Sequence, residues 1–187
     1  MNILFFIKHR ARLLALAIIT SVSGYTIAAD EMPQILGERF PDTAGNHINA
    51  HGGNIIRVDS TYYWYGEHRG DGTPGSYQQG VTCYSSQNLR DWEYRGIVLG
   101  ISNEAGSPIE RGGIIERPKV VWCPATGRYV MWFHNELKGQ GYGAARAAVA
   151  TSDSPTGPFT LKSSGRVNPG VSPLDMGDSL LTTTFPD

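Results

Sequence analysis

The fold can be read most directly from residues 50–68, AHGGNIIRVDSTYYWYGEH. Two runs rich in β-branched and aromatic residues, Asn54–Val58 and Thr61–Gly66, flank an Asp-Ser turn, which is typical of a β-hairpin. Polar groups collect where the hairpin opens, with His51 ahead of the first strand and Glu67 after the second. Because hairpin strands are antiparallel, we expect these two side chains near one edge of the sheet.

The hairpin begins a cycle of four strands that recurs along the chain. Further strands are expected at Gly80–Ser86 and Asp91–Leu99, and then at Pro118–Cys123, Arg128–His134, Arg146–Ser152 and Phe159–Ser163. Residues 67 positions apart match between the two cycles, namely Tyr62 with Tyr129, Ser85 with Ser152 and Trp92 with Phe159. Ile55 and Val120 are 65 apart because the first turn of the second cycle is two residues longer.

Four strands per repeat predict the blades of a β-propeller in an all-β protein. A two-sheet β-sandwich is the alternative, but a sandwich does not require one four-strand cycle to resemble the next. In a propeller the first strand of each blade lines the axis, so residues just ahead of it face the ligand-binding funnel. Within one domain of residues 30–187, we expect blade one at about 50–99, blade two at about 114–165 and the start of blade three at about 172–187.

The charges of the chain offer no field that would attract nucleic acid or an anionic membrane. Lysine and arginine number 16 and aspartate and glutamate 17, which leaves a formal net charge of −1. We therefore expect a neutral partner. The sequence contains two cysteines, Cys83 and Cys123, which either pair in one disulfide or remain small buried thiols.

The first 29 residues have the three parts of a cleaved signal peptide. A basic segment at Lys8–Arg12 precedes an apolar segment at Leu13–Ile19, and the small residues of Thr26–Ala29 fit a cleavage site. The alternative is an uncleaved membrane anchor, but serine and glycine interrupt the apolar run before the roughly 20 residues that a span needs. The sequence thus predicts export to the periplasm or the extracellular space, with no membrane attachment after cleavage.

Polar residues recur at equivalent positions ahead of the first strands of the blades. His51 lies four positions before Ile55, and Glu116 lies four positions before Val120. A third cycle opens near LDMGDSLL, where Asp175 falls close to the same position. We therefore expect three polar side chains from three blades to converge on the axis.

Converging carboxyl groups on a rigid β scaffold suit the hydrolysis of a glycosidic bond. This reaction needs a proton donor, a group that activates water and a neighbour that tunes their pKa values. Aromatic side chains at Trp64, Tyr65 and Tyr142 would offer flat faces to sugar rings. The residue pattern alone does not identify the sugar.

Each of these residues also has a purely structural interpretation. The interpretations are an ion pair of Glu116 with Arg117, a turn role for Asp175, a hydrogen bond at the start of a strand for His51, and a place in the core for Trp64. Pro118 further predicts an extended backbone at Arg117, which would lead from Glu116 directly into the axial strand.

Four stretches of the chain closely resemble glycoside hydrolase family 43, and within it the exo-β-1,3-galactanase branch. They are AHGGNIIRVDSTYYWYGE, GVTCYSSQNLRDWEYRGIVL, IERPKVVWCPATGRYVMWFH and ARAAVATSDSPTGPF, and the similarity runs from about Asp42 to Phe159. The resemblance implies a five-bladed β-propeller and an inverting hydrolase that releases galactose from the end of β-1,3-galactan. It also implies a monomer that acts on plant-type galactan or arabinogalactan oligosaccharides. No cofactor is required, and a structural cation such as calcium on the axis is compatible with the family.

The same resemblance implies roles for individual residues. Glu67 would contact the sugar in the innermost subsite, and Tyr142 and His51 would add substrate contacts. Glu116 would lie at the reacting centre as a catalytic residue. Asp175 would be catalytic by holding up the pKa of the general acid and orienting it.

Two departures from the family pattern affect this prediction. Most of family 43 begins blade one with an aspartate general base, whereas this chain has HGG at positions 51–53, an absence that the galactanase branch shares. The branch also continues past Asp175 to further blades and a glutamate proton donor, whereas this chain ends at Asp187. We therefore expect an N-terminal fragment without its general acid. The alternatives are a non-catalytic carbohydrate-binding fragment and a family 43 arabinofuranosidase or xylosidase.

Overall fold

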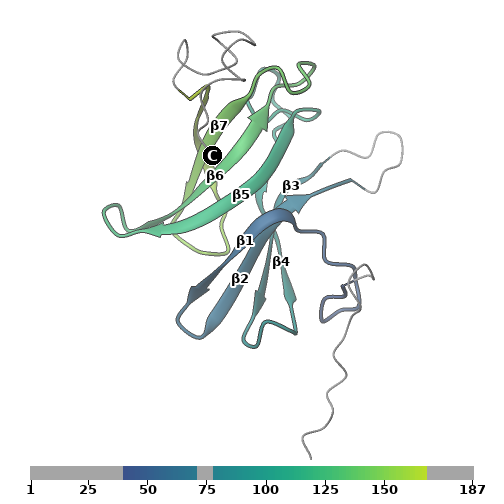
Figure 1. Cartoon of the computed structure of the whole chain (residues 1–187), viewed down its shortest axis with the longest axis vertical. Helices are drawn as coiled ribbons and strands as arrows, with labels where there is room; N and C mark the ends of the chain where they lie inside the picture. The colour runs from purple at the N-terminus through teal and green to yellow at the C-terminus, as the bar shows by residue number, and fades with distance from the viewer. Residues whose placement is uncertain (1–39, 71–77, 168–187) are drawn as a thin grey trace, which may run out of the picture. The chain divides into compact units, whose positions relative to one another are not determined.

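The computed structural model describes residues 40–70 and 78–167 of the chain. These residues form two antiparallel sheets of four strands, in the orders β1-β2-β3-β4 and β5-β6-β7-β8 (Figure 1). The strands are β1 (His51–Val58), β2 (Thr61–His68), β3 (Gly80–Ser86), β4 (Glu93–Gly100), β5 (Ile114–Cys123), β6 (Arg128–Glu136), β7 (Arg146–Ser152) and β8 (Thr160–Gly165).

All eight strands expected from the sequence are present, so the prediction of two four-strand cycles is confirmed. Consecutive strands are neighbours in each sheet, which is the order of a propeller blade and not of a Greek-key sandwich. The predicted signal peptide at 1–29, the predicted start of blade three at 172–187 and Asp175 lie outside the described residues. The predicted domain limits stay predictions.

The strand register corrects one detail of the repeat. Tyr62 lies opposite Ser86, and Tyr129 lies opposite Ser152. Ser86, and not Ser85, is therefore the counterpart of Ser152. The mismatch arises because the chain runs 24 positions from Tyr62 to Ser86 but 23 from Tyr129 to Ser152.

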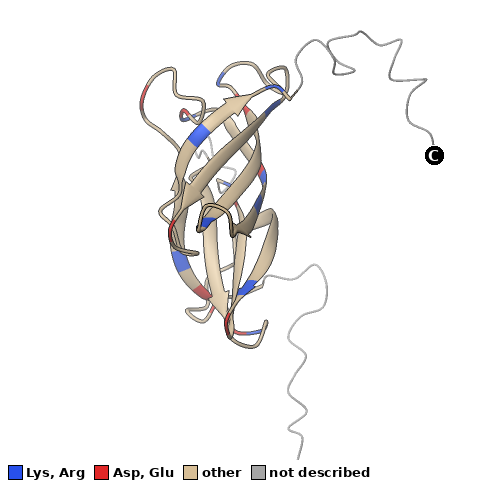
Figure 2. Cartoon of the chain, turned by 90° about the vertical axis from the view of Figure 1, so that its left-hand side faces the viewer, with Lys and Arg blue, Asp and Glu red and all other residues tan. Residues whose placement is uncertain are grey.

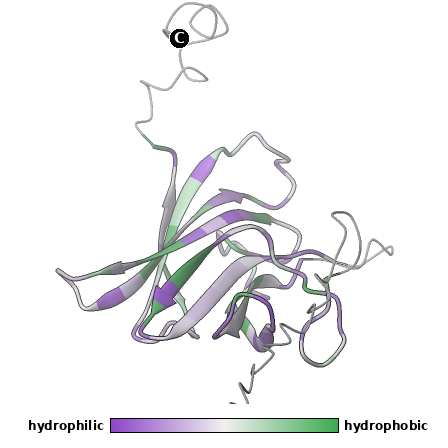
Figure 3. Ribbon diagram, turned by 60° about the horizontal axis from the view of Figure 1, so that its bottom comes forward, coloured by the Kyte–Doolittle hydropathy of each residue, from purple (hydrophilic) through white to green (hydrophobic). Residues whose placement is uncertain are grey.

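The main core lies between the two sheets, because alternate residues of each strand point to one face. Apolar and polar residues alternate along several strands (Figure 3). The first sheet contributes Tyr65, Val81, Cys83, Val98 and Leu99, and the second Ile115, Val120, Met131, Phe133, Ala148 and Ala150, with Phe159 from the loop before β8. Removing this apolar surface from water is the main stabilising contribution to the packing of the sheets.

Hydrogen bonds between the sheets hold the two first strands side by side. The Asn54 side chain accepts from the Val120 N–H and donates to the Val120 carbonyl, each over 2.9 Å. Lys119 Nζ donates to the carbonyls of Gly52 and Gly53 over 2.6 and 2.7 Å. These bonds fix β1 against β5 at the end where the predicted site residues lie.

Two of the three aromatic residues proposed to face sugar rings belong to the core instead. Tyr65 is fully buried, and its hydroxyl donates to the Pro155 carbonyl over 2.6 Å. Trp64 packs edge-on against Phe40 and Trp92, with ring centroids 6.1 and 5.3 Å apart. Tyr65 lies in the main core, whereas Trp64 is partly buried and packs against a second apolar cluster. The core interpretation of Trp64 agrees with this packing, and the buried Tyr65 ring is not accessible to a ligand.

Both cysteines are free thiols, so the disulfide alternative is wrong. Cys83 is buried in β3, and Cys123 is partly exposed at the end of β5. Acidic and basic residues both occur along the strands and loops of the two sheets (Figure 2). In the part of the chain that the structure describes, no helix is long and apolar enough to cross a membrane.

Candidate active site

The candidate site is built on a β-bulge that occurs in the first strand of each blade. The register shifts between His51 and Asn54 in β1, and between Glu116 and Lys119 in β5. A bulge inserts an extra residue, bends the strand and redirects the neighbouring side chains. Each bulge thus re-aims the polar side chain that precedes it.

The backbone of both bulges is left-handed at equivalent residues. Gly52 has a φ of 59° and Arg117 a φ of 52°. The prediction of an extended Arg117 is therefore wrong. Pro118 disfavours a helical backbone before it, but the bulge geometry that the paired strands impose decides the conformation.

The register places an acid opposite an imidazole in each blade. His51 pairs with Glu67, and Glu116 pairs with His134. His51 and Glu116 thus hold equivalent positions, as their spacing ahead of Ile55 and Val120 predicted. The acid lies on the second strand of blade one but on the first strand of blade two.

Glu116 is the most densely contacted of the predicted site residues. It is 7% exposed, and the Tyr142 hydroxyl donates to its Oε1 over 2.7 Å. Oε2 lies 3.4 Å from His134 Nδ1 and 3.5 Å from Arg117 Nη2. Burial opposes ionisation, but the hydrogen bonds from Tyr142 and His134 and the charge of Arg117 outweigh it and lower the pKa of Glu116. Glu116 is therefore a carboxylate at neutral pH, and Arg117 is one of several partners.

Glu67 lies next to this cluster on the neighbouring blade. It is 4% exposed, and Arg69 Nε lies 3.5 Å from its Oε2. A Cβ atom added to Gly52 would lie 3.1 Å from Glu67 Oε1 and 3.5 Å from Arg117 Cγ. The bulge of blade one thus runs between Glu67 and Arg117, and its glycine permits this close approach.

Two residues of this site were not predicted from the sequence, His134 and Glu136. His134 Nε2 lies 2.7 Å from Glu136 Oε1, and Glu136 is fully buried. The two alternate along β6 and so share one face of the strand. That spacing, HNE at the end of a strand, is the signal from which they could have been found.

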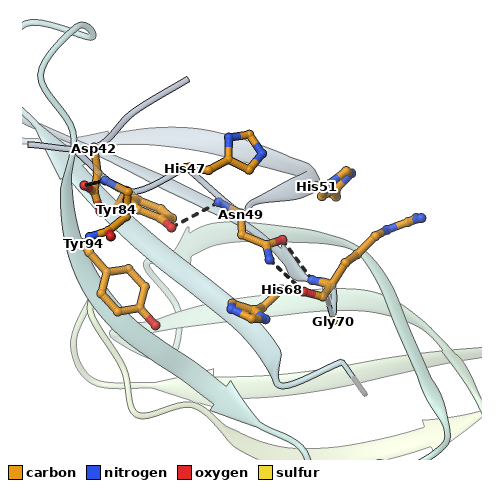
Figure 4. Close-up of a pocket in the computed structure, with 10 residues that line it drawn as sticks. Asp42, His47, Asn49, His51, His68, Gly70, Tyr84 and Tyr94 are labelled. Carbon is orange, nitrogen blue, oxygen red and sulfur yellow. Dashed lines mark hydrogen bonds between the residues drawn. The ribbon is translucent and has the colours of Figure 1, made fainter. Parts of the chain in front are cut away.

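His51 is exposed and faces a separate cavity of about 610 Å³ beside blade one. Figure 4 shows His47, His51 and His68 around this cavity, with the Asn49 side chain bonded to the backbone of Arg69. Tyr84 of β3 and Tyr94 of β4 also line this cavity. The structure thus brings Glu67, Glu116 and Tyr142 together and leaves His51 at the margin.

In residues 40–70 and 78–167, no group of three or more His, Cys, Asp or Glu side chains is arranged to hold a metal ion. The described site consists of side chains that donate and accept hydrogen bonds. Asp175, the remaining predicted site residue, lies outside the described residues.

No family model and no curated protein matches the sequence, but solved structures do. A GH43 β-1,3-galactosidase solved with galactodeoxynojirimycin is 51% identical, with a TM-score of 0.67. Exo-β-1,3-galactanases from Clostridium thermocellum and from Phanerochaete chrysosporium are 44% and 39% identical, with TM-scores of 0.63 and 0.62.

These three matches cover 80%, 75% and 74% of this chain. They cover 43%, 29% and 30% of the matched proteins, so the chain spans less than half the length of these relatives. The chain therefore belongs to glycoside hydrolase family 43, and its two four-stranded sheets are blades of the five-bladed propeller of that family.

Proposed function

We propose that this chain forms part of an exo-acting β-1,3-galactan hydrolase with an inverting mechanism. The observation that carries the proposal is the contact of Tyr142 with the ionised, nearly buried Glu116, one bulge away from Glu67. Support for the sugar comes from a 39% identical exo-β-1,3-galactanase that was solved with β-1,3-galactotriose. The proposed substrate is accordingly a galactan or arabinogalactan oligosaccharide.

The ionised state of Glu116 determines the role that we assign to it. A carboxylate cannot donate a proton, but it accepts hydrogen bonds from sugar hydroxyls and stabilises positive charge that develops on the sugar ring in the transition state. Glu67 would accept from a second hydroxyl in the innermost subsite. The ring of Tyr142, which is 61% exposed, would contact the sugar beside Glu116.

The proton donor is assigned to a carboxyl group outside the described residues, and Asp175 is proposed to hold up the pKa of that donor. Inverting hydrolases keep the proton donor and the general base about 6.5–9.5 Å apart to leave room for water.

The proposed hydrolysis is acid–base chemistry of side chains and requires no cofactor, and a cation on the propeller axis would be structural. Export through the leader at residues 1–29 and action as a monomer are parts of the proposal.

The proposal is tested by comparing the 187-residue chain with a chimera in which it is followed by the remaining blades of the Clostridium thermocellum relative. Both are incubated with β-1,3-galactobiose. We expect the chimera to release galactose, with the α-anomer appearing first in a proton NMR time course. Release from an arabinoside or xyloside in place of galactobiose would assign the chain elsewhere in the family. Binding by both proteins without turnover by either would favour the carbohydrate-binding alternative.

A further inference from the structure

Glu136 is a fully buried acid at the end of β6 that has no part in the proposed chemistry. We propose that it is a positioning residue, which holds His134 and the loop that carries Tyr142 against Glu116. The inference deepens the proposed function, because it concerns the geometry of the same site. It assigns the alignment of the site to a residue that has no contact with Glu116 itself.

Within residues 40–70 and 78–167, the hydrogen bonds of the Glu136 carboxylate all lead to the site. Oε2 accepts from the N–H groups of Ala144 and Ala145 over 2.8 and 3.0 Å, and Oε1 lies 3.1 Å from the Ala145 nitrogen. Oε1 also lies 2.7 Å from His134 Nε2. A buried carboxylate is tolerated only when hydrogen bonds replace its lost hydration. Two loop amides and one imidazole supply these bonds.

The loop contacts determine where Tyr142 lies. Tyr142 is two residues before Ala144, and the Ala145 backbone is left-handed with a φ of 44°. A left-handed alanine is strained and persists only where its surroundings hold it. The hydrogen bonds from the Ala144 and Ala145 amides to Glu136 stabilise this conformation. They anchor the end of the loop from which the Tyr142 hydroxyl reaches Glu116.

The imidazole contact determines how His134 faces Glu116. A carboxylate only accepts, so His134 Nε2 carries a hydrogen directed at the nearer Glu136, and the longer bond to Glu116 requires a hydrogen on Nδ1 as well. This bond fixes the ring plane and leaves Nδ1 facing Glu116 Oε2 at 3.4 Å. The ring also lies beside that of Tyr142, with centroids 5.8 Å apart. One buried acid thus aligns both side chains that contact Glu116 from β6 and its following loop.

The experiment uses the whole chain labelled with ¹⁵N, together with the variants Glu136→Gln and Glu110→Gln. Glu110 is the matched control, because it binds Lys138 near the start of the same loop and has no contact with His134. Proton–nitrogen correlation spectra show which ring nitrogens of His134 carry a hydrogen. Nuclear Overhauser effects report the contact of its ring with Tyr142, and hydrogen exchange reports the Ala144 and Ala145 amides. Calorimetry with β-1,3-galactobiose measures ligand affinity.

In the wild-type chain we expect a protonated Nε2, the His134–Tyr142 cross-peaks and slow exchange at both amides. Glu136→Gln places an amide NH₂ among donors, so the cross-peaks should vanish, exchange should accelerate about tenfold or more, and the galactobiose Kd should rise about tenfold. Glu110→Gln should leave all of these unchanged.

Unchanged cross-peaks and exchange in a folded Glu136→Gln would overturn the proposal. Should that variant not fold, the wild-type chain decides alone, because an unprotonated Nε2 with fast exchange at Ala144 and Ala145 would equally overturn it. A chimera with the remaining blades that neither binds nor cleaves β-1,3-galactobiose, while Glu136→Gln still loses the cross-peaks, would refute the proposed function and leave the positioning role standing.

Discussion

Tyr142 donates its hydroxyl hydrogen to Glu116 Oε1 over 2.7 Å, although 61% of the tyrosine is exposed and only 7% of the glutamate. The bond joins a solvent-facing ring to a carboxylate below the surface. The hydrogen bond to the Glu116 carboxylate also raises the pKa of the Tyr142 hydroxyl. A ligand that covers the ring would therefore exclude water from the carboxylate as well.

Replacing Tyr142→Phe should raise the pKa of Glu116, because the variant loses a donor that favours the ionised form. The expected change in unfolding free energy is small, since the ring is mostly exposed. A carbon-detected NMR titration of the Glu116 carboxyl group measures the pKa. The same pKa in both proteins would mean that the bond does not form in solution.

Replacing Glu116→Gln keeps the shape of the side chain and removes its charge. In the chimera described above, we expect turnover of β-1,3-galactobiose to fall at least about a hundredfold, the usual lower scale for a positioned acid–base or electrostatic group. Glu93→Gln is the control, because Glu93 forms an exposed ion pair with Arg95 on β4, away from the site. Full turnover per folded molecule in Glu116→Gln would make Glu116 a structural residue.

The lowered pKa of Glu116 also predicts how stability depends on pH. A carboxyl group whose pKa is lower in the folded than in the unfolded state contributes stability above the ordinary value of 4.5, and this contribution is lost as the pH falls through the folded pKa. Urea unfolding at several pH values should show a steeper acid loss for the wild-type chain than for Glu116→Gln. Parallel curves would contradict the lowered pKa.

Gly52→Ala tests the close approach between the bulge of blade one and Glu67. Its added Cβ would lie 3.1 Å from Glu67 Oε1, in a backbone with a φ of 59°. Gly127 has a φ of 62°, and a Cβ added there would meet no atom within 4 Å, so Gly127→Ala is subject to the backbone strain alone. We expect Gly127→Ala to cost about 1 kcal/mol and Gly52→Ala more. Equal losses in urea unfolding would mean that Glu67 moves aside freely.

Asn54→Ala removes both hydrogen bonds between the Asn54 side chain and the backbone of Val120. Val120 is fully buried, so its peptide groups would lose their partners. We expect a loss of about 1–3 kcal/mol in the free energy of unfolding. Asn103→Ala, at an exposed asparagine bonded to Arg111, should change stability by less than about 0.5 kcal/mol. Similar effects of the two changes would show that the Asn54 bonds contribute little net stability.

The strands could be predicted because their signals are local. Alternating apolar residues and turn chemistry located all eight strands, and the four-residue spacing before Ile55 and Val120 identified His51 and Glu116 as counterparts. Local signals failed where tertiary structure decides the outcome. The bulge overrode the preference of Arg117 before proline. Packing between the sheets buried Tyr65, and a second apolar cluster around Trp92 partly buried Trp64.

The site could be predicted in part for the same reason. Glu67, Glu116 and Tyr142 stand in motifs that can be quoted from the sequence, and the structure brings them together. Glu136 was missed because its importance depends on contacts with a loop that returns eight and nine residues later. No strand periodicity encodes that return, so only the folded chain reveals it.

The facing pairs His51–Glu67 and Glu116–His134 affect how the repeat can be detected. A position-by-position comparison of the two blades scores histidine against glutamate twice, as two mismatches. Each hairpin nevertheless contains one imidazole and one carboxylate. The two blades therefore correspond in the residue types of a facing pair and not in the strand that carries each member, so repeat detection that scores positions singly misses this correspondence.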